Sequence, residues 1–197
     1  EASPALIANA RVQMTEMIRQ YFNHPSIITW GIGNEVDIDL AFKRLGPRAD
    51  ARPLLRELNA LSRREDPSRP TVLADCCEGT PGDKAAYLPV LGDQADLIGY
   101  NRYFGWYYGK VGDLGPHLDL LHRRYPTTPI SVSEYGAGGA LTQHSGDPEG
   151  RPTNITGRPQ PEEFQSWWHE QSWPQIRARP FLWGSWIWNM FDFSSRI

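Results

Sequence analysis

The sequence predicts an α/β protein built around a parallel sheet. Short apolar runs, rich in β-branched and aromatic residues, alternate along the chain with stretches of helical periodicity. The runs are apolar throughout, which is typical of strands that crossover helices bury on both faces. Five such strands joined by helical crossovers fit either an open doubly wound sheet or part of an eight-stranded barrel. The alternation alone leaves both architectures open.

The first half of the chain opens with an amphipathic helix. Apolar residues recur at intervals of three and four from Pro4 to Phe22. Ser3 is a suitable N-cap and Pro4 a suitable first helical residue. The elements expected next are a buried strand at Ser26 to Gly31, a helix at Ala51 to Glu65, a strand at Thr71 to Asp75 and a short helix at Ala85 to Leu91.

The second half continues the alternation of strands and helices. A third strand is expected at Asp96 to Asn101 and is followed by a helix at Leu114 to Tyr125. The remaining elements are a strand at Ile130 to Ser133, a helix at Pro161 to Arg177 capped by Gln160 or a neighbour, and a strand at Leu182 to Asn189.

Length and composition restrict the classes of function. The 197 residues are enough for one domain with a sizeable core, and the net charge is −3. A slightly acidic chain has no basic surplus for binding nucleic acid or an anionic membrane. No apolar run approaches the ~20 residues that cross a bilayer. The eight Trp, eight Tyr and seven Phe suit a core or a site that stacks on sugar rings.

The only two cysteines, Cys76 and Cys77, are adjacent in the sequence. Adjacent cysteines cannot link distant segments, and no spaced Cys/His pattern for zinc accompanies them. We expect two free thiols at the end of a strand rather than a vicinal disulfide.

Carboxylates follow two of the predicted strands. Asn34 and Glu35 come just after the first strand, and Glu134 comes directly after the fourth. In a barrel the carboxyl ends of the strands meet at one mouth, where catalysis takes place. Two carboxylates at such a mouth can cleave glycosidic bonds, one as a proton donor and the other as a nucleophile. Taken singly, Glu35 could also cap a loop and Glu134 could pair with an arginine.

Four local strings carry a resemblance to a known family. The segment His24 to Glu35 (HPSIITWGIGNE) resembles the acid/base strand of glycoside hydrolase family 2, and Ser133 to Gly136 (SEYG) resembles its nucleophile strand. The strings Asn101 to Tyr107 (NRYFGWY) and Trp186 to Phe193 (WIWNMFDF) are similar to the ends of the sixth and eighth strands of the family. All four occur in the family's order and cover nearly the whole chain.

The resemblance implies a (β/α)8 TIM barrel of which only the last five strands are present. Residues 1–197 would form the C-terminal part of the catalytic barrel, strands 4 to 8. The first three barrel strands and the preceding β-sandwich domains of the family would be absent, so we expect this chain to be an excerpt of a longer polypeptide.

The resemblance also implies individual roles. Glu35 would be the general acid/base and Glu134 the nucleophile, with carboxyl groups about 5–5.5 Å apart, as in retaining glycosidases. Asn34 would hydrogen-bond the sugar 2-hydroxyl, and Tyr103 would hydrogen-bond the nucleophile. Trp188 would form the floor of the sugar subsite and precede a cis peptide bond to Asn189.

Several other side chains are weighed for the substrate cleft. Trp106 and Tyr107, in a glycine-flanked loop, are candidates for its wall, and His144, in a loop after the nucleophile strand, is a candidate substrate contact. Packing is favoured for Trp168 and Trp173. The histidines on predicted helices are expected on the surface, and these are His117, His122 and His169.

The activity implied is that of a retaining exo-glycosidase acting on terminal β-galactosides. Residues Ser133 to Gly139 and Arg158 to Trp168 are most similar to β-galactosidases of the family, whereas NRYFGWY is shared with β-glucuronidases. β-Glucuronidase or β-mannosidase activity is therefore the alternative, and a non-catalytic carbohydrate-binding barrel is the alternative from another class. No metal ligand and no required cofactor are expected. A structural Mg²⁺ or Na⁺, a homo-oligomer of the full-length protein and its cellular location are left open.

Overall fold

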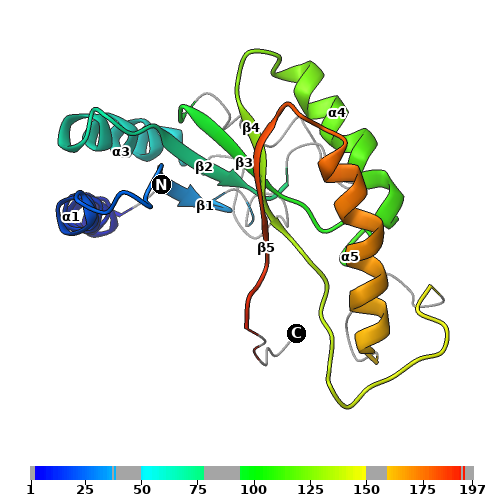
Figure 1. Cartoon of the computed structure of the whole chain (residues 1–197). Helices are drawn as coiled ribbons and strands as arrows, with labels where there is room; N and C mark the ends of the chain where they lie inside the picture. Colours follow the sequence, from blue (N-terminus) through cyan, green and yellow to red (C-terminus); the bar gives the residue numbers. More distant parts are fainter. Residues whose placement is uncertain are drawn as a thin grey trace. The chain divides into compact units, whose positions relative to one another are not determined.

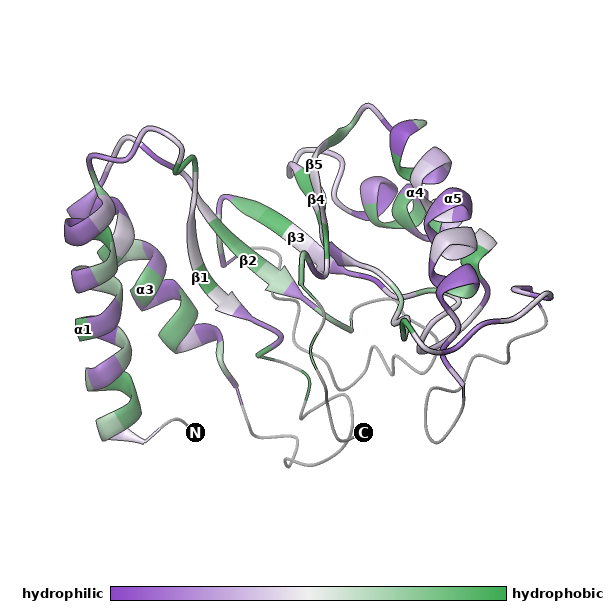
Figure 2. Cartoon of the chain, turned by 60° about the horizontal axis from the view of Figure 1, so that its bottom comes forward, coloured by the Kyte–Doolittle hydropathy of each residue, from purple (hydrophilic) through white to green (hydrophobic). Residues whose placement is uncertain are grey.

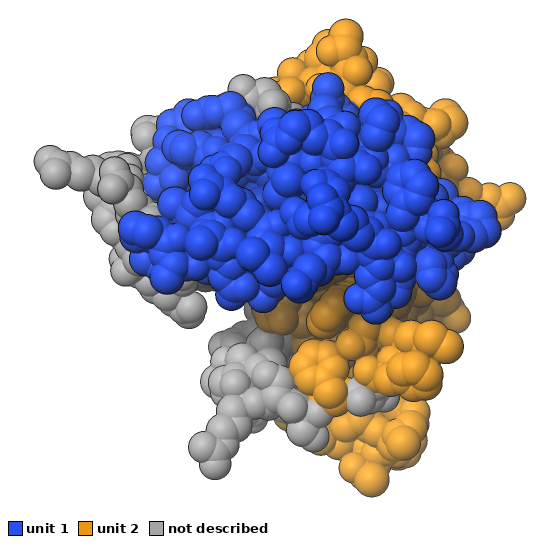
Figure 3. All heavy atoms as spheres, turned by 90° about the vertical axis from the view of Figure 1, so that its left-hand side faces the viewer, with its two compact units in different colours: residues 1–99 blue, residues 100–197 orange. Residues whose placement is uncertain are grey.

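The computed structural model describes residues 3–36, 38, 50–77, 94–149, 159–191 and 193. The five predicted strands all form and are parallel where their pairing is described, in the sheet order β1-β2-β3-β4-β5 (Figure 1). The chain divides into two compact units, residues 1–99 and residues 100–197 (Figure 3). The strands are β1 (Trp30–Asn34), β2 (Thr71–Asp75), β3 (Leu97–Asn101), β4 (Ile130–Tyr135) and β5 (Leu182–Ile187).

The first unit packs two helices beside its strands. Helix α1 (Pro4–Tyr21) starts as predicted, with the Ser3 hydroxyl accepting a hydrogen bond from the Leu6 amide at 3.2 Å. Helix α3 (Arg52–Glu65) lies beside α1 (Figure 1), and Arg19 of α1 pairs with Glu65 of α3. Their apolar faces and those of β1 and β2 form one core, which comprises Met14, Ile18, Trp30, Ile32, Leu55, Leu58, Leu61 and Leu73.

Strand β1 begins four residues later than the sequence predicted. Its ladder starts at Trp30, whose amide donates to the Pro70 carbonyl at 3.0 Å and which pairs with Thr71 of β2. Ile28, inside the predicted strand, is 61 % exposed. The apolar run was therefore a poor guide to the start of the strand, because part of it lies outside the paired region. The shift carries β1 through Asn34, so that Glu35 directly follows the strand.

A buried carboxylate anchors the amino ends of β1 and β2. Asp66 accepts hydrogen bonds from the Trp30 indole at 2.9 Å, the Arg69 guanidinium at 2.6 Å and the Ser68 amide at 2.9 Å. Burial by itself raises the pKa of Asp66, but the hydrogen bonds from Ser68, Arg69 and Trp30 outweigh it and hold the pKa far below its usual value. The carboxylate stays charged inside the fold.

The second unit packs a pair of helices against β4. The short 3₁₀ helix η1 (Val111–Asp113) leads into α4 (Leu114–Arg124), and α5 (Glu162–Arg177) lies beside α4 in both ribbon views (Figures 1 and 2). An ion pair at 2.7 Å joins Asp119, in the middle of α4, to Arg179, two residues beyond the end of α5. The core of this unit comprises Phe104, Trp106, Leu114, Leu118, Val132, Tyr135, Ala137, Phe164, Trp168 and Ile176.

Other element boundaries differ modestly from the predictions. Strand β4 extends two residues further than predicted, so Glu134 lies within the strand rather than after it. Strand β5 ends at Ile187, two residues earlier than predicted, and helix α5 starts at Glu162. The predicted short helix at Ala85 to Leu91 lies outside the described residues. Within the described part of the chain, no helix is long and apolar enough to cross a membrane.

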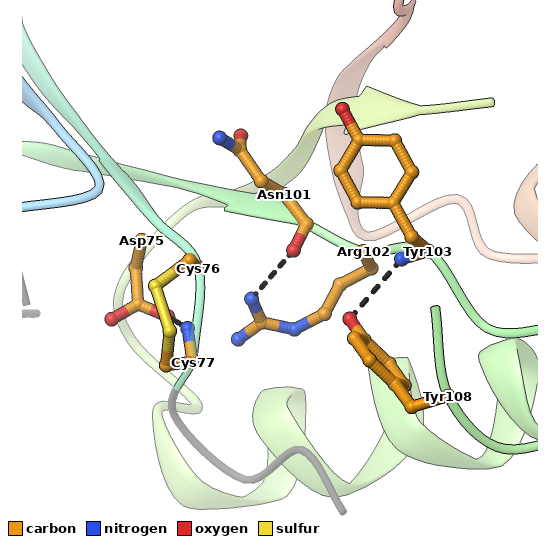
Figure 4. Close-up of a disulfide and its surroundings, with 7 residues drawn as sticks. All are labelled: Asp75, Cys76, Cys77, Asn101, Arg102, Tyr103 and Tyr108. Atoms are coloured by element: carbon orange, nitrogen blue, oxygen red, sulfur yellow. Dashed lines mark hydrogen bonds between the residues drawn. A yellow bond between two sulfur atoms is a disulfide. The ribbon is translucent and has the colours of Figure 1, made fainter. Parts of the chain in front are cut away.

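The expectation of two free thiols is wrong. Cys76 and Cys77 form a vicinal disulfide immediately after β2, and both residues are buried (Figure 4). The Cys77 amide donates to the Asp75 carboxylate at 3.1 Å, which turns the chain sharply after the last residue of the strand. This turn brings the two neighbouring side chains together.

Candidate active site

The described geometry of the site centres on Tyr103 and Glu134. The Tyr103 hydroxyl donates a hydrogen bond to Glu134 Oε2 at 2.6 Å. Glu134 is the penultimate residue of β4, and Tyr103 lies two residues beyond the end of β3, the neighbouring strand. The Arg102 amide also donates to the Glu134 carbonyl at 2.8 Å. This hydrogen bond joins the segment after β3 to the end of β4. A phenol donor at this distance favours the ionised carboxylate.

The loop after β3 holds Tyr103 from its other side. The Tyr103 amide donates to the Tyr108 hydroxyl at 3.1 Å (Figure 4). The Gly105 amide donates to the Tyr108 carbonyl at 2.7 Å and closes the loop. Gly105 has a φ of +80°, and a Cβ there would lie 2.8 Å from the Val111 amide nitrogen. Glycine is therefore required for this tight turn.

Trp106 and Tyr107, which are neighbours in this loop, differ in their exposure to solvent. Trp106, the predicted cleft wall, is buried, and its indole stacks on Phe164 of α5 with ring centroids 6.1 Å apart. Tyr107 is exposed and meets the Tyr103 ring edge-on at 5.1 Å. Of the two rings proposed for the cleft wall, the one that reaches solvent next to the Tyr103–Glu134 pair is therefore that of Tyr107.

Trp188 packs onto the backbone that follows Glu134. Its amide donates to the Tyr135 carbonyl at 2.9 Å, and its own carbonyl lies so near Gly136 that a Cβ there would be 2.3 Å away. The Trp188–Asn189 peptide bond is cis, as the resemblance implied. The indole is about half exposed, which is compatible with the predicted place in the sugar subsite.

Asn34 and Glu35 belong to the first unit. Asn34 ends β1 and is exposed, while Glu35 is half-buried, and its amide donates to the Ala74 carbonyl of β2 at 2.9 Å. Glu35 has a φ of +50°, in the left-handed region that is unfavourable for a residue with a Cβ. Backbone strain of this kind is found at functional sites more often than elsewhere. The spacing between the Glu35 and Glu134 carboxylates stays a prediction.

His144 faces helix α5. Its Nδ1 lies 2.9 Å from the Glu163 carboxylate, which also accepts a hydrogen bond from the Ser145 amide at 3.0 Å. The hydrogen bond with Glu163 and the charges of Glu163 and Glu162 raise the pKa of His144. The side chain thus fastens its loop to the amino end of α5, and its suggested contact with substrate stays a prediction.

The sequence did not lead us to expect two polar side chains, His117 and Arg102, in the core. His117 is buried rather than on the surface, and its Nε2 accepts a hydrogen bond from Arg102 Nε at 2.8 Å. Burial and the Arg102 charge lower the pKa of His117 to about 3, so the imidazole is neutral near pH 7. The sequence did hold a signal, because His117 lies three residues after Leu114 in the apolar stripe of α4. Arg102, also fully buried, lies next to Tyr103 in the chain.

Over the described residues, no group of three or more His, Cys, Asp or Glu side chains is placed to hold a metal ion.

A parallel α/β sheet with carboxylates at the carboxyl ends of its strands is the arrangement of barrel enzymes. Residues 3–196 match the model of the TIM barrel domain of the glycosyl hydrolases family 2. The chain belongs to this family. The match confirms the family and the barrel class inferred from the four strings, and it decides against the open doubly wound sheet.

The chain is similar to proteins named as β-glucuronidases and to one named as a β-galactosidase. A β-glucuronidase of Bacteroides fragilis is 38 % identical over 187 residues, which are 95 % of this chain and 24 % of that protein. The structure of a provisionally named β-galactosidase of Bacteroides fragilis superposes with a TM-score of 0.77 at 36 % identity, covering 95 % of this chain and 26 % of that one.

The third is β-glucuronidase 2 of Bacteroides uniformis, covalently bound to cyclophellitol-6-carboxylate aziridine. It superposes with a TM-score of 0.80 at 31 % identity, over 99 % of this chain and 23 % of that one. The chain therefore spans about a quarter of the length of the relatives it matches.

Proposed function

We propose that the polypeptide containing this chain is a retaining β-glycosidase with Glu134 as its nucleophile. The observation that carries the proposal is the 2.6 Å hydrogen bond from the Tyr103 hydroxyl to Glu134 Oε2 at the ends of neighbouring strands. A nucleophilic carboxylate must be ionised and must be held at a fixed angle to the anomeric carbon. A single phenol donor serves both needs, because it stabilises the anion and restricts its rotation.

The proposed reaction has two displacements. Glu134 attacks the anomeric carbon while Glu35 protonates the leaving oxygen, and the glycosidic bond breaks as the glycosyl ester forms. Glu35 then takes a proton from water, the hydroxide attacks the anomeric carbon, and the Glu134 carboxylate leaves. Asn34 would hold the sugar 2-hydroxyl, a contact that strengthens as positive charge develops on the ring. Trp188 would support the sugar from below.

We propose β-glucuronides as the preferred substrates and β-galactosides as the second candidate. The β-glucuronidase of Bacteroides fragilis and that of Bacteroides uniformis support the first choice, since both resemble this chain over nearly its whole length. The provisionally named β-galactosidase supports the second, as do the segments around Ser133 and Arg158. A β-mannoside has the family resemblance alone in its favour.

We further propose that the chain supplies the last five strands of the barrel, strands 4 to 8. Glu35, Glu134 and Trp188 would then follow or end the fourth, seventh and eighth strands and converge with side chains from the first three. The share of the relatives that this chain covers, about a quarter, is consistent with such a part. Activity is accordingly expected of the full-length polypeptide rather than of the chain alone.

The experiment is a panel of p-nitrophenyl β-glycosides offered to the full-length protein and to its Glu134→Gln variant. We expect turnover of the glucuronide to exceed that of the galactoside and mannoside, with a first product of β configuration. The variant should bind the sugar without forming a glycosyl ester. Binding without turnover by the unaltered protein would instead support a carbohydrate-binding barrel. An α-configured first product would mean that the roles given to Glu35 and Glu134 are wrong.

A further inference from the structure

We propose that Trp168 of α5 is a positioning residue for the nucleophile and for the tyrosine that orients it. Trp168 is completely buried. Its indole N–H donates to the Phe104 carbonyl at 2.9 Å, and its ring stacks on Tyr135 with centroids 6.1 Å apart and planes 29° apart. This inference rests on the proposed function.

The two contacts have a common consequence. Phe104 is the residue after Tyr103, and Tyr135 is the residue after Glu134, so one side chain holds the neighbour of each member of the hydrogen-bonded pair. The hydroxyl–carboxylate distance of 2.6 Å leaves little tolerance, because hydrogen bonds weaken steeply as distance and angle depart from their optimum. A shift of either backbone segment would lengthen the bond between Tyr103 and Glu134.

Helix α5 holds the segment after β4 at further points. Gln165 Nε2 donates to the Ala137 carbonyl at 2.8 Å, and Glu163 accepts the Ser145 amide. A Cβ on Gly139 would lie 2.9 Å from the Gln165 carboxamide oxygen, so a glycine permits this close approach. These contacts fix the chain beyond Glu134, whereas Trp168 bonds to the β3 side of the pair and stacks on its β4 side. We therefore assign the positioning to Trp168.

Packing alone is the competing explanation for so large a buried ring. If Trp168 only fills the core, its loss should lower stability and the fraction of folded protein, while each folded molecule keeps its normal turnover. If it positions the pair, turnover per folded site should fall, and the fall should depend on the presence of the Tyr103 hydroxyl. A purely structural role of Trp168 would not make the fall in turnover depend on the Tyr103 hydroxyl.

The experiment compares Trp168→Phe with Trp173→Phe in the full-length protein. Phenylalanine keeps a ring at position 168 and removes the N–H donor. Trp173 lies on the same helix and is about half exposed, which makes it the matched control. Active sites are counted with the 2-fluoro analogue of the preferred sugar, which accumulates as the glycosyl ester. Then kcat per counted site, KM and the pH profile of kcat/KM are measured, each also in a Tyr103→Phe background.

For Trp168→Phe we expect kcat per counted site to fall about 3- to 10-fold, the effect of one hydrogen bond. KM should change less than about twofold, and the acid limb of kcat/KM should move to higher pH because the Glu134 anion loses stabilisation. In the Tyr103→Phe background the same substitution should cost less than about twofold, since the bond it protects is already gone. Trp173→Phe should match the unaltered protein.

An unchanged kcat per counted site in Trp168→Phe would overturn the inference, and so would a loss of equal size in the Tyr103→Phe background. If phenylalanine prevents folding, benzothienylalanine at position 168 removes the N–H and keeps the shape of the indole, and the same two outcomes decide. Failure of the unaltered protein to turn over any β-glycoside would overturn the proposed function instead, so the two failures are distinguishable.

Discussion

Replacing Glu35 by glycine should give a more stable protein than replacing it by alanine. In the part of the chain that the structure describes, Glu35 is the one residue other than glycine with a positive φ, at +50°. A Cβ in this left-handed conformation is crowded against the following carbonyl oxygen, whereas glycine adopts it without penalty. Both substitutions remove the carboxylate, so whatever the carboxylate contacts is lost equally in the two variants.

Two opposing terms set the magnitude. The left-handed conformation costs a residue with a Cβ about 1–2 kcal/mol. Glycine gains more freedom than alanine in the unfolded chain, which costs about 0.5–1 kcal/mol. The difference leaves Glu35→Gly about 0.5–1 kcal/mol more stable than Glu35→Ala. Both variants should lose turnover, as expected where a strained backbone holds a functional side chain.

The assay is urea unfolding of the full-length protein followed by tryptophan fluorescence. The control is Val36→Gly against Val36→Ala, one position further along, where φ is not positive and glycine should be the less stable by about 0.5–1 kcal/mol. A Glu35→Gly variant no more stable than Glu35→Ala, with the control pair behaving normally, would show that the left-handed conformation does not burden the fold.

Three further predictions concern charge. Glu134→Gln should form no glycosyl ester with a 2-fluoro sugar, as read by the mass of the intact protein. Asp66→Asn should lower the free energy of unfolding by about 3–5 kcal/mol, because it leaves buried donors without their anion, whereas Asp50→Asn at an exposed ion pair should cost under about 1 kcal/mol. The pKa of His117 is about 3 in the fold and near 6.5 when unfolded, so the unfolded state binds the proton first. The free energy of unfolding should therefore decrease as the pH drops from about 6.5 toward 3. Urea midpoints measured over this pH range should decrease less in His117→Gln than in the unaltered protein.

The placement of the site along the sheet followed from local sequence. Apolar runs in the sequence predict the strands, and polar residues at the carboxyl ends of parallel strands lie at one edge of the sheet. That reasoning placed Glu35 directly after β1, as the structure has it, and Glu134 directly after the fourth strand, whereas Glu134 is the penultimate residue of β4. The pairing of Tyr103 with Glu134 came from the resemblance and is confirmed by the 2.6 Å contact.

Local sequence failed where tertiary packing decided the outcome. A histidine on a helix is usually solvated, but burial, together with the neighbouring Arg102 charge, makes an unprotonated His117 favourable inside α4. The apolar Ile27 and Ile28 read as strand because periodicity cannot show where a neighbouring strand begins to pair. The turn after Asp75, which joins Cys76 to Cys77, depends on a side-chain contact that spacing does not encode.

The same distinction applies to the chemistry of the site. Each reacting group is specified locally, by a strand end, but the 2.6 Å bond between Tyr103 and Glu134 requires two strands to be in register, which no local string can ensure. The Arg102 amide bonded to the Glu134 carbonyl sets that register, and the Trp168 indole bonded to Phe104 holds the loop beyond it. On the assignment proposed above, Trp168 of α5 would thus set the angle at which Glu134 is presented to the sugar. Substitution of Trp168 should therefore alter turnover more than substrate binding, because it changes the geometry of the reacting pair and leaves the sugar contacts in place.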